Sequence, residues 1–320
     1  MNKRRTRSPL AAVSLALAIC LVLHVEAGCG NDDYAKPIKQ FQDASAVVIA
    51  SARQSLQQMN QVEEDAELDR QIFEGEAFDE TKIKARDVVT QPESDIRLKA
   101  FDELARYTSA LADLAALKGP SEVTQQFQDV NSAFSTLAKD AEKLSGTKSS
   151  IFDNAKFSGV VSAATLAIGT VVRAVEEHRA RREIEKQIRE HDADVTALIQ
   201  LLGDELDLAY QRRKAAEGQE EIFLTAALKI ELAKPAKGDP TLRILLGERL
   251  KDWRNRQPIL ADANPKSCVE AMRRAHEALV AYVNSDKSPK SLSQLYAAAQ
   301  DFFSRVQPLA QAMAALVKSA

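Results

Sequence analysis

Apolar residues that recur every three or four positions are the feature that most constrains this fold. The clearest run steps 4-3-4-3-4-3 without an error, at Val123, Phe127, Val130, Phe134, Leu137, Ala141 and Leu144. A second run follows near the C-terminus, at Leu292, Leu295, Ala299, Phe302, Val306, Leu309, Met313 and Leu316. A strict seven-residue repeat is typical of coiled coils and antiparallel bundles. The sequence therefore predicts helices that each bury one narrow apolar stripe.

Helix start signals recur in the C-terminal third of the chain. Asp239-Pro240, Asn264-Pro265 and Ser288-Pro289 each combine a capping residue with proline at the first helical position. No segment shows sustained alternation with β-branched enrichment, so no sheet is expected. We predict an all-α protein, an elongated bundle of about seven or eight antiparallel, coiled-coil-like helices that include one very long helix. Residues 34–234 form this bundle, and the C-terminal helices in 239–320 pack on it.

The stretch from 155 to 214 lacks proline and predicts that very long helix, roughly 90 Å in length. Its first part, 157–172, is uncharged and rich in small residues, which predicts a helix at the centre of the bundle, surrounded on all sides. The middle, 176–190, is mostly charged and is expected to be exposed, whereas 195–210 is amphipathic again. The apolar stripe shifts phase between 175 and 184, which predicts a change of packing partner or a bend.

The first 28 residues have the order of a secretory signal: a basic start, an apolar stretch at 11–23, and small residues at Ala27 and Gly28. The segment resembles a bacterial lipoprotein precursor, because Ala27-Gly28-Cys29 matches the last three positions of the lipobox. Glu26 stands where that family has an apolar residue. The resemblance covers the export segment only. It implies that Cys29 is acylated and begins the mature chain, with 29–33 as a tether.

This resemblance implies a protein anchored by its N-terminal lipid in the cell membrane or outer membrane, facing the periplasm or the exterior. The alternative is ordinary cleavage after Ala27, which gives a soluble periplasmic or secreted protein. The chain has a formal net charge of −3, and loss of the basic signal leaves the mature chain at −6. Such a chain has no general attraction to nucleic acid. Only Cys268 remains after Cys20 leaves and Cys29 is acylated, so no intramolecular disulfide is expected.

The motifs of known catalytic and metal sites are missing. A ferritin-like site needs Glu-x-x-His, but no glutamate stands three residues before His178, His191 or His276. His191 and Asp194 lie one helical turn apart, and such a pair could bind a metal ion with help from another helix. A half-buried histidine on the apolar stripe is the simpler interpretation. Residues 145–148 match the Ser-x-x-Lys of penicillin-recognising enzymes without that family's other elements. We predict no catalytic, cofactor-binding or metal-binding residue, and no enzyme.

The remaining prediction is a non-catalytic binding or structural role at the bacterial cell envelope, with a protein partner. The candidate partner contacts are the cations of the charged segment and the histidine beside it: Arg179, Arg181, Arg182, Lys186, Arg189 and His191. The alternative is a membrane-inserting effector that uses 157–172, similar in architecture to helical pore-forming toxins. That segment falls just short of the ~20 residues that cross a bilayer.

Overall fold

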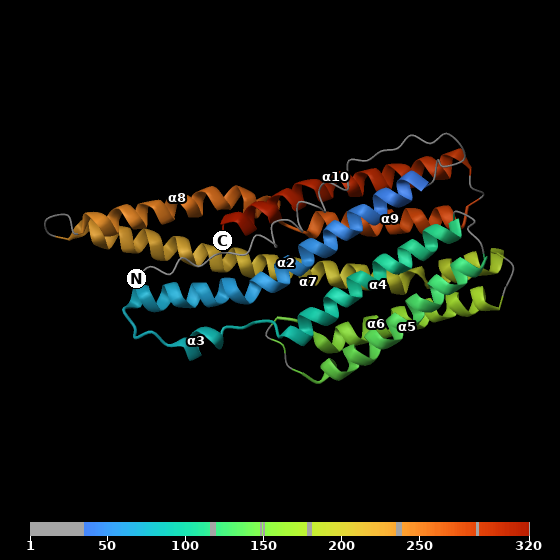
Figure 1. Cartoon of the computed structure of the whole chain (residues 1–320), viewed down its shortest axis with the longest axis horizontal. Coiled ribbons are helices and arrows are strands. Elements are labelled where there is room, and N and C mark those ends of the chain that lie inside the picture. The colour runs from blue at the N-terminus through green and yellow to red at the C-terminus, as the bar shows by residue number, and fades with distance from the viewer. Residues whose placement is uncertain are drawn as a thin grey trace, which may run out of the picture.

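The computed structural model describes residues 35–115, 120–147, 149, 151–177, 181–234, 239–285 and 288–319. Within these residues the chain forms nine helices and no strand, as the sequence predicts for an all-α bundle (Figure 1). The helices are α2 (Ala35–Glu74), α3 (Glu80–Lys84), α4 (Gln91–Ala115), α5 (Pro120–Ser145), α6 (Asn154–Glu176), α7 (Arg181–Ala233), α8 (Pro240–Asp262), α9 (Lys266–Val283) and α10 (Pro289–Ser319).

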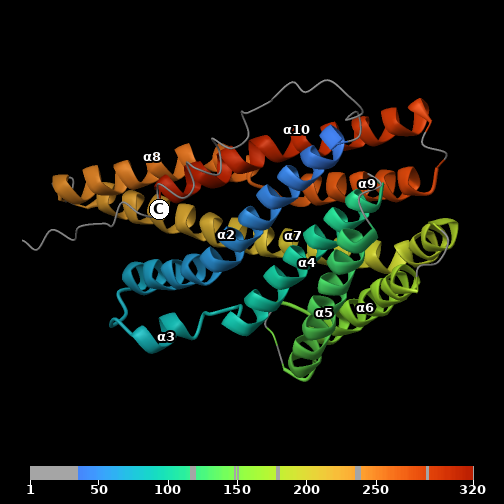
Figure 2. The same ribbon diagram turned by 45° about the vertical axis from the view of Figure 1, so that its right-hand side comes forward.

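Helix α7 is the axis of the molecule. It has 53 residues, about 80 Å at the usual rise per residue. Helices α2, α6, α8 and α9 all pack against it, while α5 packs on α6 and α10 packs on α2 and α9 (Figures 1 and 2). One core of buried apolar residues runs from Phe41 in α2 to Leu316 in α10. A very long helix therefore organises the bundle, as expected.

The prediction of one helix over 155–214 is wrong in its bounds. Helix α6 ends at Glu176, and the N–H of Glu177 donates a hydrogen bond to the carbonyl oxygen of Arg173 at this end. Helix α7 begins at Arg181 and continues past Gly218 to Ala233. The two helices pack against each other, which explains the phase shift of the apolar stripe. In one straight helix, the apolar stripes before and after the phase shift would point in different directions. Because α7 folds back on α6, the two stripes face each other and both are buried.

Helix α6 is not surrounded on all sides, which corrects a second expectation. It packs on α5 and α7 and buries Phe157, Val161 and Ile168 there, but Leu166 on its outer side is 75% exposed. Small residues face α5, since a Cβ on Gly169 would lie 3.2 Å from Asn131 Oδ1. Among the described helices, α6 alone has the length and composition to cross a membrane, with a mean hydropathy of 1.6 over 18 residues. The core helix of a globular protein can meet the same criterion.

The predicted stripes and start signals are confirmed. Every member of the Val123 to Ala141 run is buried in α5, as are Leu295 to Leu316 of the C-terminal run in α10. Asp239 accepts a hydrogen bond from Thr241 N at 2.8 Å at the start of α8, and Asn264 accepts one from Lys266 N at 2.9 Å before α9. The local capping chemistry thus fixes where each of these helices begins.

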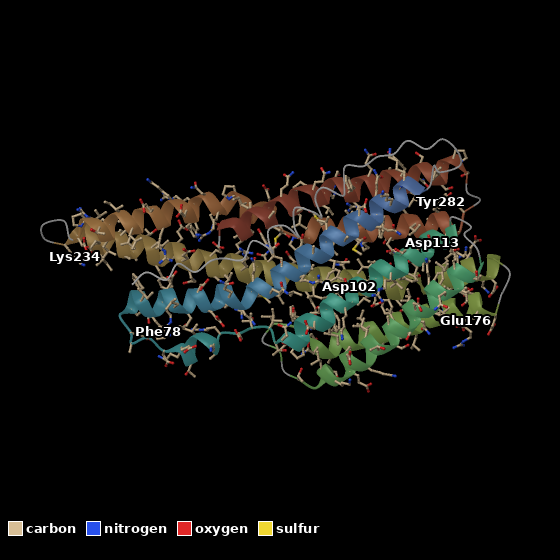
Figure 3. The ribbon with its side chains drawn as sticks, viewed as in Figure 1. Phe78, Asp102, Asp113, Glu176, Lys234 and Tyr282 are labelled. Carbon is tan, nitrogen blue, oxygen red and sulfur yellow. The ribbon has the colours of Figure 1, made fainter. Side chains whose placement is uncertain are left out.

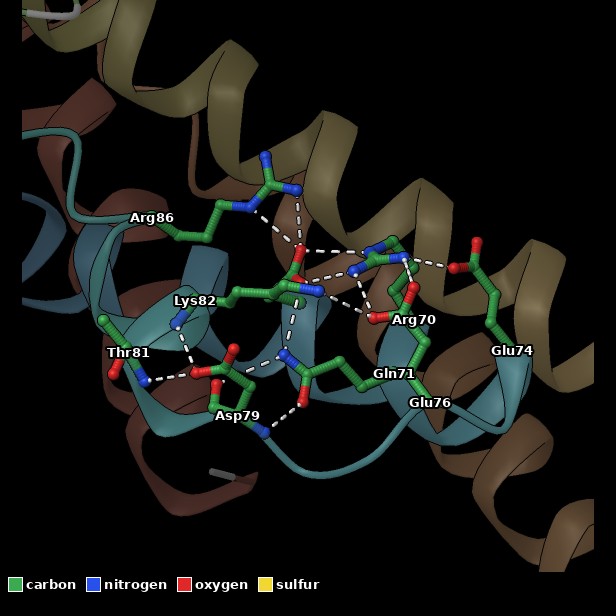
Figure 4. Close-up of polar contacts among 9 residues, drawn as sticks. Arg70, Gln71, Glu74, Glu76, Asp79, Thr81, Lys82 and Arg86 are labelled. Carbon is green, nitrogen blue, oxygen red and sulfur yellow. Dashed lines mark hydrogen bonds and ion pairs between the residues drawn. The ribbon is translucent and has the colours of Figure 1, made fainter.

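A cluster of charges around Glu67 holds the end of α2 (Figure 4). The Glu67 carboxylate accepts hydrogen bonds from Arg70 Nη2 at 2.7 Å and from Arg86 Nη2 at 2.6 Å. Beside it, Gln71 Oε1 accepts one from Asp79 N at 3.0 Å. Helix α2 ends at Gly75, whose φ of 69° is the left-handed conformation that favours glycine. These contacts attach α3 and the loop before it to the end of α2.

Candidate functional site

The distal parts of α7 and α8 form a helical hairpin that projects from one end of the bundle. We call residues 222–233 of α7 and 240–250 of α8 the arm, and Lys234 marks its tip (Figure 3). The bundle reaches the base of the arm through two contacts. The rings of Phe73 and Phe223 lie 5.2 Å apart, and Arg249 Nη2 lies 3.0 Å from Asp69 Oδ2.

The arm has a small core that is separate from the main one. Leu224, Leu250 and Trp253 are buried there, with Leu228 and Leu246 packed partly against them. The indole Nε1 of Trp253 donates to the carbonyl oxygen of Glu217 at 2.7 Å, which fixes α8 against α7. Two helices alone bury little apolar surface, so this hairpin depends on its base and its turn for rigidity.

A single carboxylate closes the turn of the arm. Glu231 is 2% exposed and accepts hydrogen bonds from Lys234 Nζ and from the backbone N–H of Asp239. The hydrogen bond from Lys234, followed by that from Asp239, lowers the pKa of Glu231 below its ordinary value. The carboxylate is therefore ionised and fully paired, and it ties the end of α7 to the start of α8.

Exposed apolar side chains gather on the arm. Of the eleven large apolar residues that are exposed in the described part of the chain, eight lie on the arm or beside its base. They are Ile222, Ile230, Leu232, Leu242, Ile244 and Leu245 on the arm, and Ile72 and Phe73 beside its base. The exposed apolar surface of the described residues is therefore concentrated on this projecting element.

The sequence reading of α8 needs a correction here. In the sequence, one apolar stripe of this helix is formed by Leu242, Leu245, Leu246, Leu250 and Trp253, and this spacing predicts that the whole stripe is buried. Leu250 and Trp253 are buried, but Leu242 is 38% and Leu245 is 53% exposed, because only α7 lies beside this end of α8. The run Ile244-Leu245-Leu246 was the available signal, since three consecutive apolar residues cover more than one side of a helix.

A charged cleft of about 400 Å³ separates the base of the arm from α2 and the end of α10. It is lined by four carboxylates and three guanidinium groups: Asp65, Asp69, Glu217, Glu220, Arg213, Arg249 and Arg256. Arg249 Nη2 lies 3.0 Å from Asp69 and 3.4 Å from Glu220, so it joins α2 to α7 and α8. Burial raises the pKa of Glu220, and Arg256 opposes the shift. The cleft braces the arm through mutually compensating charges.

The predicted partner contacts lie at the other end of α7. Lys186 and Arg189 are exposed, and Lys186 Nζ lies 4.0 Å from Glu183 and 3.9 Å from Glu190. His191 is partly exposed, with its Nδ1 3.9 Å from Asp194 Oδ2. Lys186 and Arg189 lie on one side of the first turns of α7, and His191 lies on the other side. All three are remote from the arm (Figure 1).

Several predicted site residues cannot be placed in this way. Cys29 and Arg179 lie outside the described residues, as do the signal at 1–28 and the tether at 29–33. The side chains of Arg181 and Arg182 are likewise not described, although both residues belong to the first turn of α7. In the described part of the chain, no group of three or more His, Cys, Asp or Glu residues is arranged to hold a metal ion.

Sequence reasoning missed a buried histidine. His276 on α9 is fully buried, its Nε2 lies 2.9 Å from Asp192 Oδ1 on α7, and its Nδ1 has no hydrogen-bond partner among the described residues. The ring of Tyr107 on α4 lies 6.0 Å away, and burial followed by the charge of Asp192 raises the pKa of that tyrosine. This group joins three helices inside the bundle. His276 carried no motif in the sequence that distinguished it from the other histidines.

Comparison with known proteins gives no relative: no family model, no curated protein and no solved structure matches the chain.

Proposed function

We propose that this chain is an exported, lipid-anchored protein of the bacterial cell envelope with a non-catalytic binding or structural role. The signal at 1–28 and the small residues before Cys29 support export and acylation. The observation that carries the binding role is the gathering of exposed apolar side chains on the arm. A projecting hairpin with unburied apolar surface is an element for contact.

Metabolic labelling with an alkyne-bearing fatty acid tests the anchor. The full precursor is produced in a bacterial host beside its Cys29→Ala variant, and the label on the purified chains is compared. We expect label on the wild type, none on the variant, and an intact mass for the wild type that begins at an acylated Cys29. An unlabelled wild-type chain that begins at Gly28 would replace the anchor with the soluble periplasmic or secreted alternative.

We propose the cationic start of α7 as the contact for a protein partner in the envelope. Lys186 and Arg189 are exposed on one side of these turns, and His191 is partly exposed on the other. A photoreactive residue at position 186 should give a discrete protein adduct in intact cells. The same residue at Lys139, an exposed lysine on α5, is the matched control. Equal adducts at both positions, or none at 186, would remove this face from the proposal.

The second candidate function is membrane insertion through 157–172, favoured by the apolar composition of α6. Insertion requires α6 to leave α5 and α7, and it would expose Phe157, Val161 and Ile168, which are now buried. Release of an encapsulated dye from vesicles by the mature chain separates the two functions. We expect no release, since each of these side chains is already packed, and rapid release would favour the second candidate.

A further inference from the structure

We propose that the tip of the arm, residues 229–234 and 239–245, docks on an anionic lipid surface. Four of its exposed apolar residues are Ile230, Leu232, Ile244 and Leu245. Residues two apart on a helix point about 200° from each other, so Ile230 and Leu232 emerge on opposite sides of α7. Ile244 and Leu245 likewise point about 100° apart on α8. A helix packed on one side of the hairpin would leave the other side exposed, whereas the interfacial layer of a membrane surrounds it.

The charge of the tip fits a negatively charged surface. The tip has three basic side chains, Lys229, Lys234 and Arg243, against two acidic ones, Glu231 and Asp239. It thus carries +1 in a chain whose formal net charge is −3, and the sequence between its two helices adds one more lysine and no acidic residue. Basic residues beside an apolar tip are attracted by anionic headgroups, and the apolar side chains then enter the boundary of the acyl layer.

The buried carboxylate of the tip does not oppose docking. An unpaired carboxylate is costly to bring to a lipid interface. Glu231 is already removed from water and accepts hydrogen bonds from Lys234 and Asp239. The end of α7 is therefore already tied to the start of α8, and no helix of the bundle has to separate for the tip to dock.

The tip also lies away from the predicted anchor. Helix α2 starts beside the first turns of α10, where Lys36 Nζ lies 5.6 Å from the centre of the Tyr296 ring, in the half of the molecule opposite the arm (Figure 1). Cys29 precedes Ala35 by six residues, which span at most about 20 Å. If the proposed acylation holds, the arm is a second point of membrane contact at the other end of the molecule, and this clause alone rests on the proposed function.

The test uses the mature chain, residues 29–320, with Cys29→Ser, so that no lipid contributes. Its cosedimentation is measured with vesicles of phosphatidylcholine, with and without about 30% phosphatidylglycerol. We expect binding to the anionic vesicles that weakens as salt rises toward ~0.5 M. The double variant Ile230→Glu/Ile244→Glu should bind at least ~10-fold more weakly, because it puts carboxylates where apolar side chains enter the lipid. Lys229→Glu should bind several-fold more weakly, on the order of fivefold.

The matched control is Leu166→Glu, the same kind of change at an exposed apolar residue of α6. It should bind as the unsubstituted chain does, and circular dichroism should show all variants equally helical. Three results would overturn the proposal: no binding to anionic vesicles, a double variant that binds normally, or loss of binding in Leu166→Glu instead. A concentration-dependent dimer in analytical ultracentrifugation that the double variant abolishes would also overturn it, since a second copy would then cover the tip. Fatty-acid labelling of the precursor is unaffected by any of these outcomes.

Discussion

Arg97 on α4 and Glu205 on α7 form a bidentate ion pair inside the bundle, with Nε–Oε2 and Nη2–Oε1 distances of 2.8 Å. The guanidinium also lies 4.0 Å from the centre of the Phe152 ring and donates to Asn154 Oδ1 at 3.1 Å. Asn154 in turn donates to Glu93 Oε1 at 2.8 Å. One buried network thus ties α4, α6 and α7 together at the start of α6, and every charge within it has a partner.

Arg97→Ala should lower the free energy of unfolding by about 3–5 kcal/mol, because it leaves Glu205 buried without its cation. Burial already raises the pKa of Glu205 against the pull of Arg97, and the variant should raise it further. A carboxyl group with a raised pKa stabilises the folded state at low pH, where it is protonated. The decrease in the free energy of unfolding caused by Arg97→Ala should therefore be smaller at pH 5 than at pH 7. Urea unfolding at both pH values measures this. Lys99→Ala, which breaks the exposed pair with Asp140, should cost less than about 1 kcal/mol.

Gly203→Ala should destabilise the contact of α7 with α9. A Cβ at position 203 would lie 2.6 Å from Val269 Cγ1, so the two helices must separate, at a cost of about 1–3 kcal/mol. Gly247→Ala is the control, since nothing lies within 4 Å of its added methyl group. It should instead stabilise α8 by about 0.5–1 kcal/mol through helix propensity. Thermal unfolding of the two variants should therefore shift in opposite directions.

Glu67→Gln should remove part of the sensitivity of the protein to acid. Hydrogen bonds from Arg70, then Arg86 and Gln71, hold the pKa of Glu67 at about 2, below its usual 4.5. A lowered carboxyl pKa contributes stability above pH 4.5 that is lost as pH falls toward 2. The wild type should therefore exceed the variant in stability at pH 6, and the gap should narrow on acidification. A gap that stays constant from pH 6 to pH 2 would contradict the assigned pairing.

Cys268 should resist alkylation in the folded protein. Burial raises the pKa of its thiol to about 11, and its Sγ lies 3.1 Å from the carbonyl oxygen of Arg305. At pH 8 only about one thiol in a thousand is then ionised, and the thiolate is the reactive form. Iodoacetamide labelling of the Cys29→Ser chain, followed by mass spectrometry, should be slow in buffer and fast in urea. Rapid labelling in buffer would show that α9 and α10 separate readily.

The sequence predicted those parts of the fold that local chemistry determines. The stripe of α5 and the caps at Asp239 and Asn264 depend on residues within one helix or its first turn, and the structure confirms them. The break between α6 and α7 was harder to predict from sequence, because the residues before and after it are strong helix formers. The phase shift of the stripe was the true signal there, whereas the absence of proline was misleading.

The arm was beyond sequence reasoning for a different reason. Leu242 and Leu250 belong to the same predicted stripe, yet one is 38% and the other 8% exposed. Their difference depends on where α2 and α10 end beside α8, which is a property of the assembled bundle. The pairing of Arg97 with Glu205 across 108 positions is equally non-local, and neither residue has a motif that suggests the other.

The continuity of α7 has a mechanical consequence. The same helix that is buried among α2, α6 and α9 also forms one side of the arm, so no interdomain linker lies between them. A displacement of Lys234 is therefore transmitted into the bundle through α7 itself, with α8 fixed beside it by Trp253 and the base held by the link from Arg249 to Asp69. Gly218 lies in α7 near this base, and its low helix propensity makes that turn intrinsically weaker than an alanine would.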